Sequence, residues 1–221
     1  MDIYLPSSST GTKPPVVVIV SGYPDPQGGL RSVGWHVSWA RLLAASGVAV
    51  VIYGNLHPAA DVHHVLSHLR EHASALGIDA QRIGLLAASG HGPVALSVLM
   101  RDARLACAAL LNAYTMDLDG STYVANVARE YGCVDACAGK SVADLPAGVP
   151  LIFVRSGRDQ FPGINEALDR VVASGLARNL PISLVNHHTG VHAFDLMEES
   201  ELVRSIIRQV LAFLCLHLEV R

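Results

Sequence analysis

Charged residues are scarce in this sequence. They make up 16% of the 221 residues, against 51% hydrophobic residues, and the formal net charge is only −3. A chain without an excess of Lys and Arg lacks the basic face that nucleic acids require, so we expect no nucleic-acid partner. The apolar runs are short and interrupted by glycine or polar residues, which predicts no membrane-spanning helix and no membrane association.

Signals for targeting and for nucleotide binding are also missing. The N-terminal segment MDIYLPSSSTGTKPP has no cationic start followed by an apolar core. We therefore expect no secretory signal and a cytoplasmic location. Gly28-Gly29 lacks the surrounding spacing of a glycine-rich phosphate loop, so a nucleotide site has no support.

Cysteine is rare, and its spacing is not that of a metal or redox motif. No CxxC occurs, which favours free thiols in a reducing compartment. A local pair between Cys133 and Cys137 is the alternative. The four cysteines are Cys107, Cys133, Cys137 and Cys215.

Short apolar runs alternate with helical patterns along the whole chain, which at this length predicts a single domain over residues 1–221. The runs are nearly all apolar, as expected for strands that are covered on both faces. An extra strand at Ile3–Leu5 is expected at an edge. The other strand candidates are Val16–Val20, Val48–Tyr53, Ile83–Ala87, Cys107–Leu111, Leu151–Val154 and Ile182–Val185.

Helical spacing marks the segments between these strands. The alternation predicts an α/β fold, a three-layer sandwich with a mostly parallel central sheet and helices on both faces. The helix candidates are Gly34–Ala45, Ala59–Leu76, Gly92–Arg101, Asn165–Ala177 and Ser200–Leu218. One apolar face of the second is formed by Val62, Val65, Leu66, Leu69, Ala73 and Leu76.

Residues 114–146 break the alternation with Gly, Asp, Ser and short mixed segments. Long irregular connections in compact domains are commonly functional. We expect a small lid or pocket segment here, because the stretch is too short for a separate cap domain.

Three polar residues follow three different predicted strands. Open parallel sheets bind ligands beyond the carboxyl ends of their strands, so these ends are the places to search. Ser89 stands on a strand–turn–helix segment with the small residues Ala87 and Gly90 on either side, where the Gly90 N–H can stabilise an oxyanion. The alternative is an ordinary turn in which Ser89 caps the following helix.

Asp159 and His192 complete the set. Asp159 follows Gly157 and can accept a hydrogen bond from a histidine ring, although a solvated loop Asp is the simpler interpretation of that residue alone. His192 lies in the loop NHHTGVHAFDL, where His187 and His188 are alternative bases. The order Ser, Asp, His along successive strand ends favours a nucleophile, an acid and a base.

The motifs resemble those of the α/β-hydrolases, specifically the dienelactone-hydrolase-like serine esterases, over nearly the whole chain. MDIYLP resembles the opening strand, VVVIVSGYPD the oxyanion turn, RIGLLAASGHG the nucleophile elbow, SGRDQ the acid loop and GVHAFD the histidine loop. The resemblance implies that Tyr23 contributes its backbone N–H to an oxyanion hole together with Gly90. It also implies an α/β-hydrolase fold.

Two positions depart from this pattern. The elbow's second glycine is His91, which either tilts the turn or projects into the pocket, and Gly92 follows it. The histidine expected before the oxyanion turn is Ser21. These departures favour the alternative of a catalytically silent fold that acts as a binding module. Dienelactone hydrolase itself uses a cysteine nucleophile, so its lactone substrate is not carried over.

The chemistry that follows is the hydrolysis of small-molecule carboxylic esters of small to medium acyl groups through an acyl-enzyme on Ser89. Lactones or thioesters are alternative substrates for the same residues. No metal or organic cofactor is required. We expect Trp35, His91 and Tyr114 to shape the substrate pocket.

Two further patterns have structural explanations. His64, His68 and His72 recur at helical spacing beside charged residues, which is typical of a solvated helix face rather than a metal site. The C-terminal helix has an apolar face that forms either core or a homodimer contact. That face comprises Leu202, Ile206, Val210, Phe213, Leu214 and Leu218.

Overall fold

A twisted sheet of seven strands runs through the computed structural model, which describes residues 1–7 and 12–220. The strand order is β1-β3-β2-β4-β5-β6-β7, and every neighbouring pair is parallel except β1 with β3. The strands are β1 Asp2–Tyr4, β2 Pro15–Ile19, β3 Ala49–Ile52, β4 Asp79–Ala88, β5 Cys107–Leu111, β6 Leu151–Ser156 and β7 Ile182–His187. Residues 8–11 and 221 of the predicted domain lie outside the described part.

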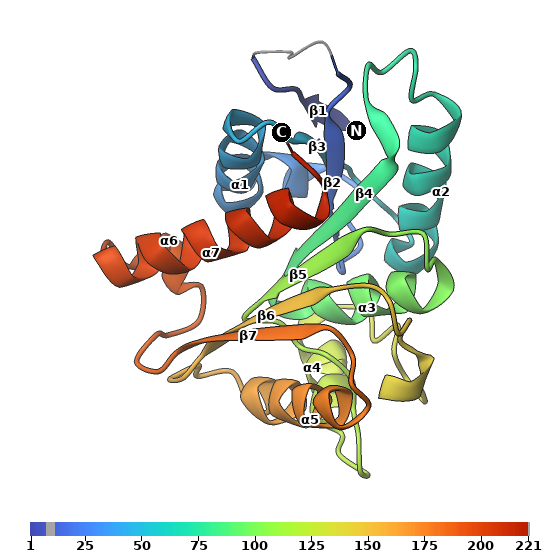
Figure 1. The fold of residues 1–221 in the computed structure, drawn as a ribbon. Helices are drawn as coiled ribbons and strands as arrows, with labels where there is room; N and C mark the ends of the chain where they lie inside the picture. Colours follow the sequence, from blue (N-terminus) through green and yellow to red (C-terminus); the bar gives the residue numbers. More distant parts are fainter. Residues whose placement is uncertain (8–11, 221) are drawn as a thin grey trace.

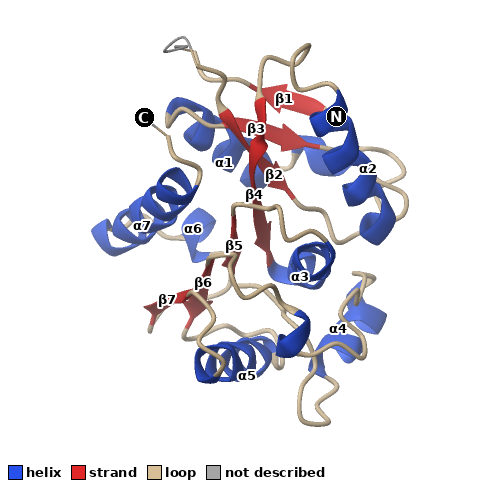
Figure 2. Cartoon of the chain, turned by 45° about the vertical axis from the view of Figure 1, so that its right-hand side comes forward, coloured by secondary structure: helices blue, strands red, loops and turns tan. Residues whose placement is uncertain are grey.

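Helices cover both faces of this sheet, as Figure 2 shows by colour. In Figure 1, α1 and α7 lie on one side of the strands, whereas α2 and α3 lie on the other. The helices are α1 Gly34–Ala45, α2 Pro58–Glu71, α3 Gly92–Arg101, α4 Tyr123–Tyr131, α5 Ile164–Ala177, α6 Phe194–Met197 and α7 Glu201–His217. The predicted three-layer α/β sandwich is confirmed.

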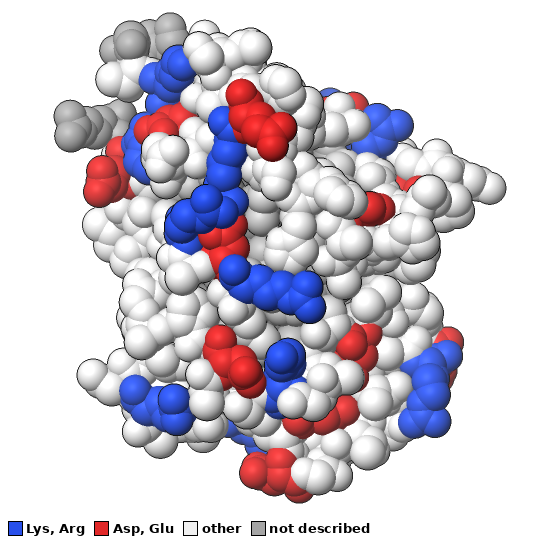
Figure 3. Space-filling model, turned by 90° about the vertical axis from the view of Figure 1, so that its right-hand side faces the viewer, with Lys and Arg blue, Asp and Glu red and all other residues white. Residues whose placement is uncertain are grey.

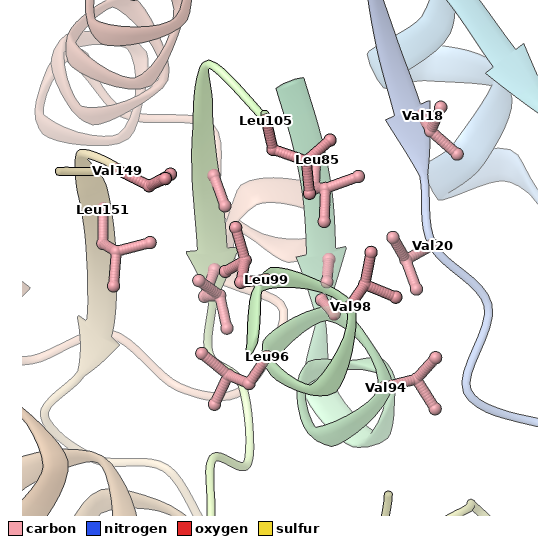
Figure 4. Close-up of a cluster of buried hydrophobic side chains, with 14 of the residues drawn as sticks. Val18, Val20, Leu85, Val94, Leu96, Val98, Leu99, Leu105, Val149 and Leu151 are labelled. Carbon is pink, nitrogen blue, oxygen red and sulfur yellow. The ribbon is translucent and has the colours of Figure 1, made fainter. Parts of the chain in front are cut away.

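Two hydrophobic cores result from the alternation of side chains along each strand. Val16 and Val18 of β2 point into the core under α2, α3 and α5, whereas Val17 and Ile19 point into the core under α1 and α7. Figure 4 shows part of the first core, where Val94 and Val98 of α3 lie beside the strands. Consecutive residues of a strand enter the two cores in turn, so both the odd and the even positions are apolar. These strands therefore appear in the sequence as continuous apolar runs.

The last strand differs from that expectation. β7 forms the edge of the sheet, and only Ile182 and Val185 pack against the two cores, while Leu184 is exposed. The prediction that every strand is covered on both faces is therefore wrong for β7. At the other edge, the predicted N-terminal strand is confirmed as β1, which pairs antiparallel with β3.

Two predicted helix faces are also corrected. Helix α2 ends at Glu71, so Ala73 and Leu76 pack against the first core from the turn that follows it. In α7, Leu202 is exposed, whereas the buried face contacts the second core through Val203, Ile206, Val210 and Leu214. The apolar face of α7 thus forms core.

Residues 114–146 contain the short helix α4, which packs against α5. Val124 and Val127 of α4 join a third apolar cluster with Tyr114 and Cys133. Cys133 and Cys137 are both free thiols, and the Cys137 thiol donates to the Pro93 carbonyl oxygen at 3.1 Å. The alternative of a disulfide between them is therefore wrong for this structure.

The surface carries both signs of charge. On the face in Figure 3, acidic and basic side chains alternate and much of the remaining surface is uncharged. Asp102, which is buried, pairs with both Arg70 and Arg104. In residues 1–7 and 12–220, no helix has the length and apolar character that crossing a membrane requires.

Candidate active site

Ser89 lies on a strained turn between β4 and α3. Its φ is 51°, in the left-handed region that a residue with a side chain rarely adopts. Two backbone hydrogen bonds of 3.0 Å fix the turn, from Ser89 N to Asn112 O and from Tyr114 N to Ser89 O. The turn places the hydroxyl at the carboxyl edge of the sheet, as the strand–turn–helix pattern predicts.

Gly92 supplies the small residue that this turn needs. A Cβ at Gly92 would collide with the Tyr114 carbonyl oxygen and approach Ala113 Cβ to 2.9 Å. In the usual motif, the glycine that allows this close approach is the second residue after the serine. Here it is the third residue, Gly92. His91 therefore fits without a clash between α3 and the strand-end segment at Tyr114.

The three predicted residues form one hydrogen-bonded line. His192 Nε2 lies 3.0 Å from Ser89 Oγ, and His192 Nδ1 lies 2.7 Å from Asp159 Oδ2. The carboxylate can only accept, so Nδ1 carries the proton and Nε2 is free to accept from the serine hydroxyl. The Asp159 side chain is 1% exposed and that of His192 is 12% exposed, which shields the hydrogen bond between them from water.

Asp159 is fixed by the loop after β6. Its backbone N–H donates to Ser156 O at 3.1 Å, and its Oδ1 accepts from Phe161 N at 3.0 Å. Gly157 allows this loop to cross the histidine loop closely, because a Cβ there would collide with the backbone of His188. One carboxylate oxygen is thus held by the backbone and the other faces His192.

The loop that carries His192 is held from three sides. Arg158 N donates to Gly190 O at 2.9 Å, and the Phe161 ring meets the imidazole edge-on at 4.5 Å between ring centres. Behind the loop, Asp195 Oδ2 accepts from Trp35 Nε1 at 2.8 Å and Trp39 Nε1 at 2.9 Å. These contacts fix the ring without a regular element at His192 itself.

The alternative bases lie elsewhere. His187 is buried, its Nε2 is 3.1 Å from Glu198 Oε2, and its ring packs on Phe194. His188 is exposed. Among the described hydrogen bonds, neither histidine reaches the Ser89 hydroxyl.

The predicted oxyanion segment packs directly on the elbow. A Cβ at Gly22 would lie 2.5 Å from Gly90 O and 2.7 Å from His91 Cα, so only glycine allows this approach. Within residues 1–7 and 12–220, Tyr23 N–H has no hydrogen-bond acceptor. Gly90 N–H belongs to the first turn of a 3-10 helix, where backbone donors lack intrahelical partners.

His91 neither tilts the turn nor stands free. Its Nδ1 accepts a 2.7 Å hydrogen bond from Gly22 N–H, and its ring packs edge-on against Tyr23 and His36. Burial, with a smaller contribution from neighbouring His36, lowers the pKa of the His91 imidazole to about 3. The ring is therefore neutral and keeps its acceptor lone pair at ordinary pH.

Several solved structures of esterases have a similar fold. Esterase 2 of the planctomycete Thermogutta terrifontis is similar over 96% of this chain and 85% of its own, with TM-score 0.74 and 17% identity. A bacterial heroin esterase covers 98% and 78% of the two chains (TM-score 0.73, 16% identity), and carboxyl esterase 2 of the fungus Tuber melanosporum covers 98% and 81% (0.73, 17%). The planctomycete esterase was also solved with propionate bound and phosphorylated by paraoxon. Neither protein-family models nor curated protein sequences gave a match.

The chain has the α/β-hydrolase fold. Similarity to solved structures at 16–17% identity establishes the fold. It does not establish the dienelactone-hydrolase-like subtype. Within this α/β-hydrolase fold, Ser89 follows β4, Asp159 follows β6 and His192 follows β7. Strand β5 lies between β4 and β6.

The residues predicted to shape a pocket have other contacts as well. Trp35 lies in the core under α1 and reaches His36 and Asp195, whereas Tyr114 is buried and its hydroxyl donates to Pro162 O at 2.8 Å. Burial raises the pKa of Tyr114. It also raises the pKa of Tyr23 to about 12, with neighbouring Cys133 adding to the rise. These phenols are neutral donors.

Several residues of this candidate site were not predicted from sequence. Phe161 lies against His192, and Cys133 lies beside Gly90, where an added Cβ would approach Cys133 Cβ to 3.1 Å. Phe161 follows Asp159 by two positions, so its place in the acid loop was a usable signal. Cys133 comes from the irregular segment 114–146, whose path the sequence does not indicate.

The three histidines that recur at helical spacing are solvated. His64, His68 and His72 are exposed; His64 is 3.6 Å from Asp61, and the His68 and His72 rings meet at 4.4 Å between centres. In the described part of the chain, no group of three His, Cys, Asp or Glu residues is arranged to hold a metal ion.

Proposed function

We propose that this protein is a serine hydrolase that cleaves carboxylic esters of small to medium acyl groups through an acyl-enzyme on Ser89. The observation that supports it most is the hydrogen-bonded line from Ser89 through His192 to Asp159. A serine hydroxyl becomes a useful nucleophile when an oriented base can take its proton, and this line provides both the base and its orientation.

The first half of the reaction forms the acyl-enzyme. Ser89 Oγ attacks the ester carbonyl carbon while its proton passes to His192 Nε2, and Asp159 stabilises the imidazolium that results. The Tyr23 and Gly90 N–H groups donate to the carbonyl oxygen as it becomes an oxyanion. When the tetrahedral intermediate collapses, the bond to the leaving alkoxide breaks and His192 returns the proton to that oxygen.

The second half repeats the sequence with water. His192 takes a proton from a water molecule, the hydroxide attacks the acyl carbon, and the Ser89 oxygen leaves with the proton from His192. The products are a carboxylic acid and an alcohol, and the enzyme returns to its starting state.

The motifs support a finer assignment to the dienelactone-hydrolase-like serine esterases, and a carboxylesterase as the class of activity. The solved neighbours are esterases, and one of them binds propionate, a short carboxylic acid of the kind that a small acyl ester releases. We expect a small-molecule substrate and a cytoplasmic enzyme that acts without metal or organic cofactor. Lactones and thioesters are close substrates to compare.

The test is covalent labelling with a fluorophosphonate. The wild type should be labelled with one equivalent, Ser89→Ala should not, and Ser38→Ala, which changes an exposed serine of α1, should label like the wild type. p-Nitrophenyl acetate hydrolysis should follow the same order. If the wild type neither labels nor hydrolyses short esters, the catalytically silent binding module replaces this proposal.

A further inference from the structure

His91 stands where the elbow pattern has a glycine, and its side chain reaches across to the oxyanion segment. We propose that His91 is a positioning residue for the oxyanion hole: its Nδ1 holds Gly22 N–H so that the next donor, Tyr23 N–H, stays directed at the oxyanion formed above Ser89. This inference rests on the proposed function, because it assigns a role within that reaction.

The oxyanion segment needs such a contact because it lies beyond the sheet ladder. Val20 N–H, which donates to Leu86 O at 2.9 Å, makes the last ladder bond of this chain segment. After it, Ser21 N donates to the Tyr53 hydroxyl at 3.3 Å and Gly22 O accepts from Val134 N at 2.8 Å. The His91–Gly22 bond, at 2.7 Å, is shorter than either.

Unlike the hydrogen bonds to Tyr53 and Val134, the bond to His91 joins the oxyanion segment to the turn that carries Ser89. Tyr53 follows β3 and Val134 belongs to the segment 114–146, whereas His91 stands two residues after Ser89. Ser21 makes no such link, since its hydroxyl donates to Tyr23 O at 3.3 Å within the same segment. The His91–Gly22 bond therefore sets the segment relative to the nucleophile.

The His91 ring is itself held in place. It packs edge-on against Tyr23, at 5.0 Å between ring centres, and against His36 at 5.6 Å. Because Nδ1 accepts from a backbone N–H, the neutral ring carries its proton on Nε2. The ring is thus a fixed acceptor rather than a proton carrier.

Because Gly22 N–H donates to His91, it is not available to the oxyanion, and the next amide, Tyr23 N–H, takes that role. With Gly22 N–H engaged, the adjacent Tyr23 N–H is the amide of this segment without a partner in the described residues. An oxyanion donor works only within about 2.7–3.1 Å of the oxygen's final position. A shift of the segment by less than about one ångström therefore reduces the stabilisation of the transition state by Tyr23 N–H more than it reduces the affinity for substrate.

Two substitutions separate the acceptor from the bulk of the ring. His91→Asn keeps an acceptor oxygen at the position of Nδ1 but removes the ring, whereas His91→Phe keeps a ring against Tyr23 and His36 but has no acceptor. We expect H91F to lower kcat for p-nitrophenyl acetate by about 10- to 100-fold with KM nearly unchanged, because loss of a whole oxyanion donor costs about 10²–10³ in kcat. We expect H91N to stay within about threefold of the wild type.

The opposite order, with H91F active and H91N impaired, would show that the ring only fills space and would overturn the inference. A wild type that labels and hydrolyses esters while H91F matches it also overturns the inference but leaves the proposed function standing. A wild type that does neither removes the proposed function first. The two failures are therefore distinguishable.

A measurement on the unaltered protein covers the case in which the variants do not fold. In the ¹⁵N-labelled wild type, His91 Nδ1 should resonate as an unprotonated nitrogen and should show a through-hydrogen-bond coupling to the Gly22 amide nitrogen. A protonated Nδ1, or a His91 Nδ1 with no such coupling while other histidines are resolved, would rule out the contact on which the role depends.

Discussion

His36 is buried in an unusual way for a histidine. Its side chain lies between Trp35 and His91, the residue is 3% exposed, and neither ring nitrogen has a hydrogen-bond partner in the described part of the chain. Burial lowers the pKa of His36 to about 4, with the charge of Asp25 opposing it. Folding therefore favours the neutral ring.

This burial makes the fold sensitive to acid. Below pH 6.5 the unfolded chain takes up a proton at His36, whereas the folded chain does so only near pH 4, so the free energy of unfolding decreases as the pH falls between these values. The loss from this group is at most about 3 kcal/mol. His36→Phe removes the titration, and denaturant unfolding at several pH values should show a weaker decrease than in the wild type.

The matched control is His188→Gln, which changes an exposed histidine. Its unfolding free energy should depend on pH as that of the wild type does. Parallel curves for the wild type and H36F between pH 6.5 and 4 would mean that His36 is not held neutral by the fold.

Helix α1 and the short helix α6 are joined through a carboxylate. Asp195 lies three residues after His192 and accepts from both indole N–H groups of α1 at one oxygen. Hydrogen bonds to a charged group are stronger than neutral ones, so this contact ties the histidine loop to a helix that packs in the core.

Weakening this anchor should affect stability and reaction together. Trp39→Phe removes one donor, and we expect it to lower the unfolding free energy by about 2 kcal/mol and to lower kcat. Leu42→Ala, on a partly exposed position of the same helix, should stay within about 0.5 kcal/mol. If W39F loses stability but keeps the kcat of L42A, the anchor does not determine the position of His192.

The elements that sequence predicts well are those whose signal is local. Apolar runs located the strands, and both α1 and α3 begin and end where the spacing predicted. Helix α4 was missed because only Val124 and Val127 of its residues are buried, and their partners come from α5 and Tyr114. Helix α6 was missed because four residues are too few to show a period.

The same division applies to the site. Ser89, Asp159 and His192 were predicted because their order along the chain follows the order of strand ends, and the structure brings them together. The partner of His91 was not predictable, since Gly22 lies 69 positions away and the bond depends on how two loops meet. Trp39 and Asp195 were hidden for the same reason, at a separation of 156 positions.

One face of the sheet depends on helices from opposite ends of the chain. Helix α1 begins at residue 34 and α7 ends at residue 217, yet they cover the same face (Figure 1). The C-terminal helix is therefore part of the core rather than an appendage.

Leu214 and Leu216 test this on one helix. Leu214 is 0% exposed in the core under α1 and α7, whereas Leu216 is 71% exposed. Leu214→Ala should lower the unfolding free energy by about 2–5 kcal/mol, and Leu216→Ala by less than about 0.5 kcal/mol. Equal effects in urea unfolding would mean that α7 does not pack as described.

The sheet order has a consequence for protein synthesis. A nascent chain that has emerged as far as β6 already carries the Ser89 hydroxyl, but the imidazole lies 103 positions after that hydroxyl and beyond the last strand to be made. Until β7 pairs with β6, no ribosome-bound intermediate has a base beside its nucleophile. Under the proposed function, reactivity toward esters therefore begins only after β7 has joined the sheet.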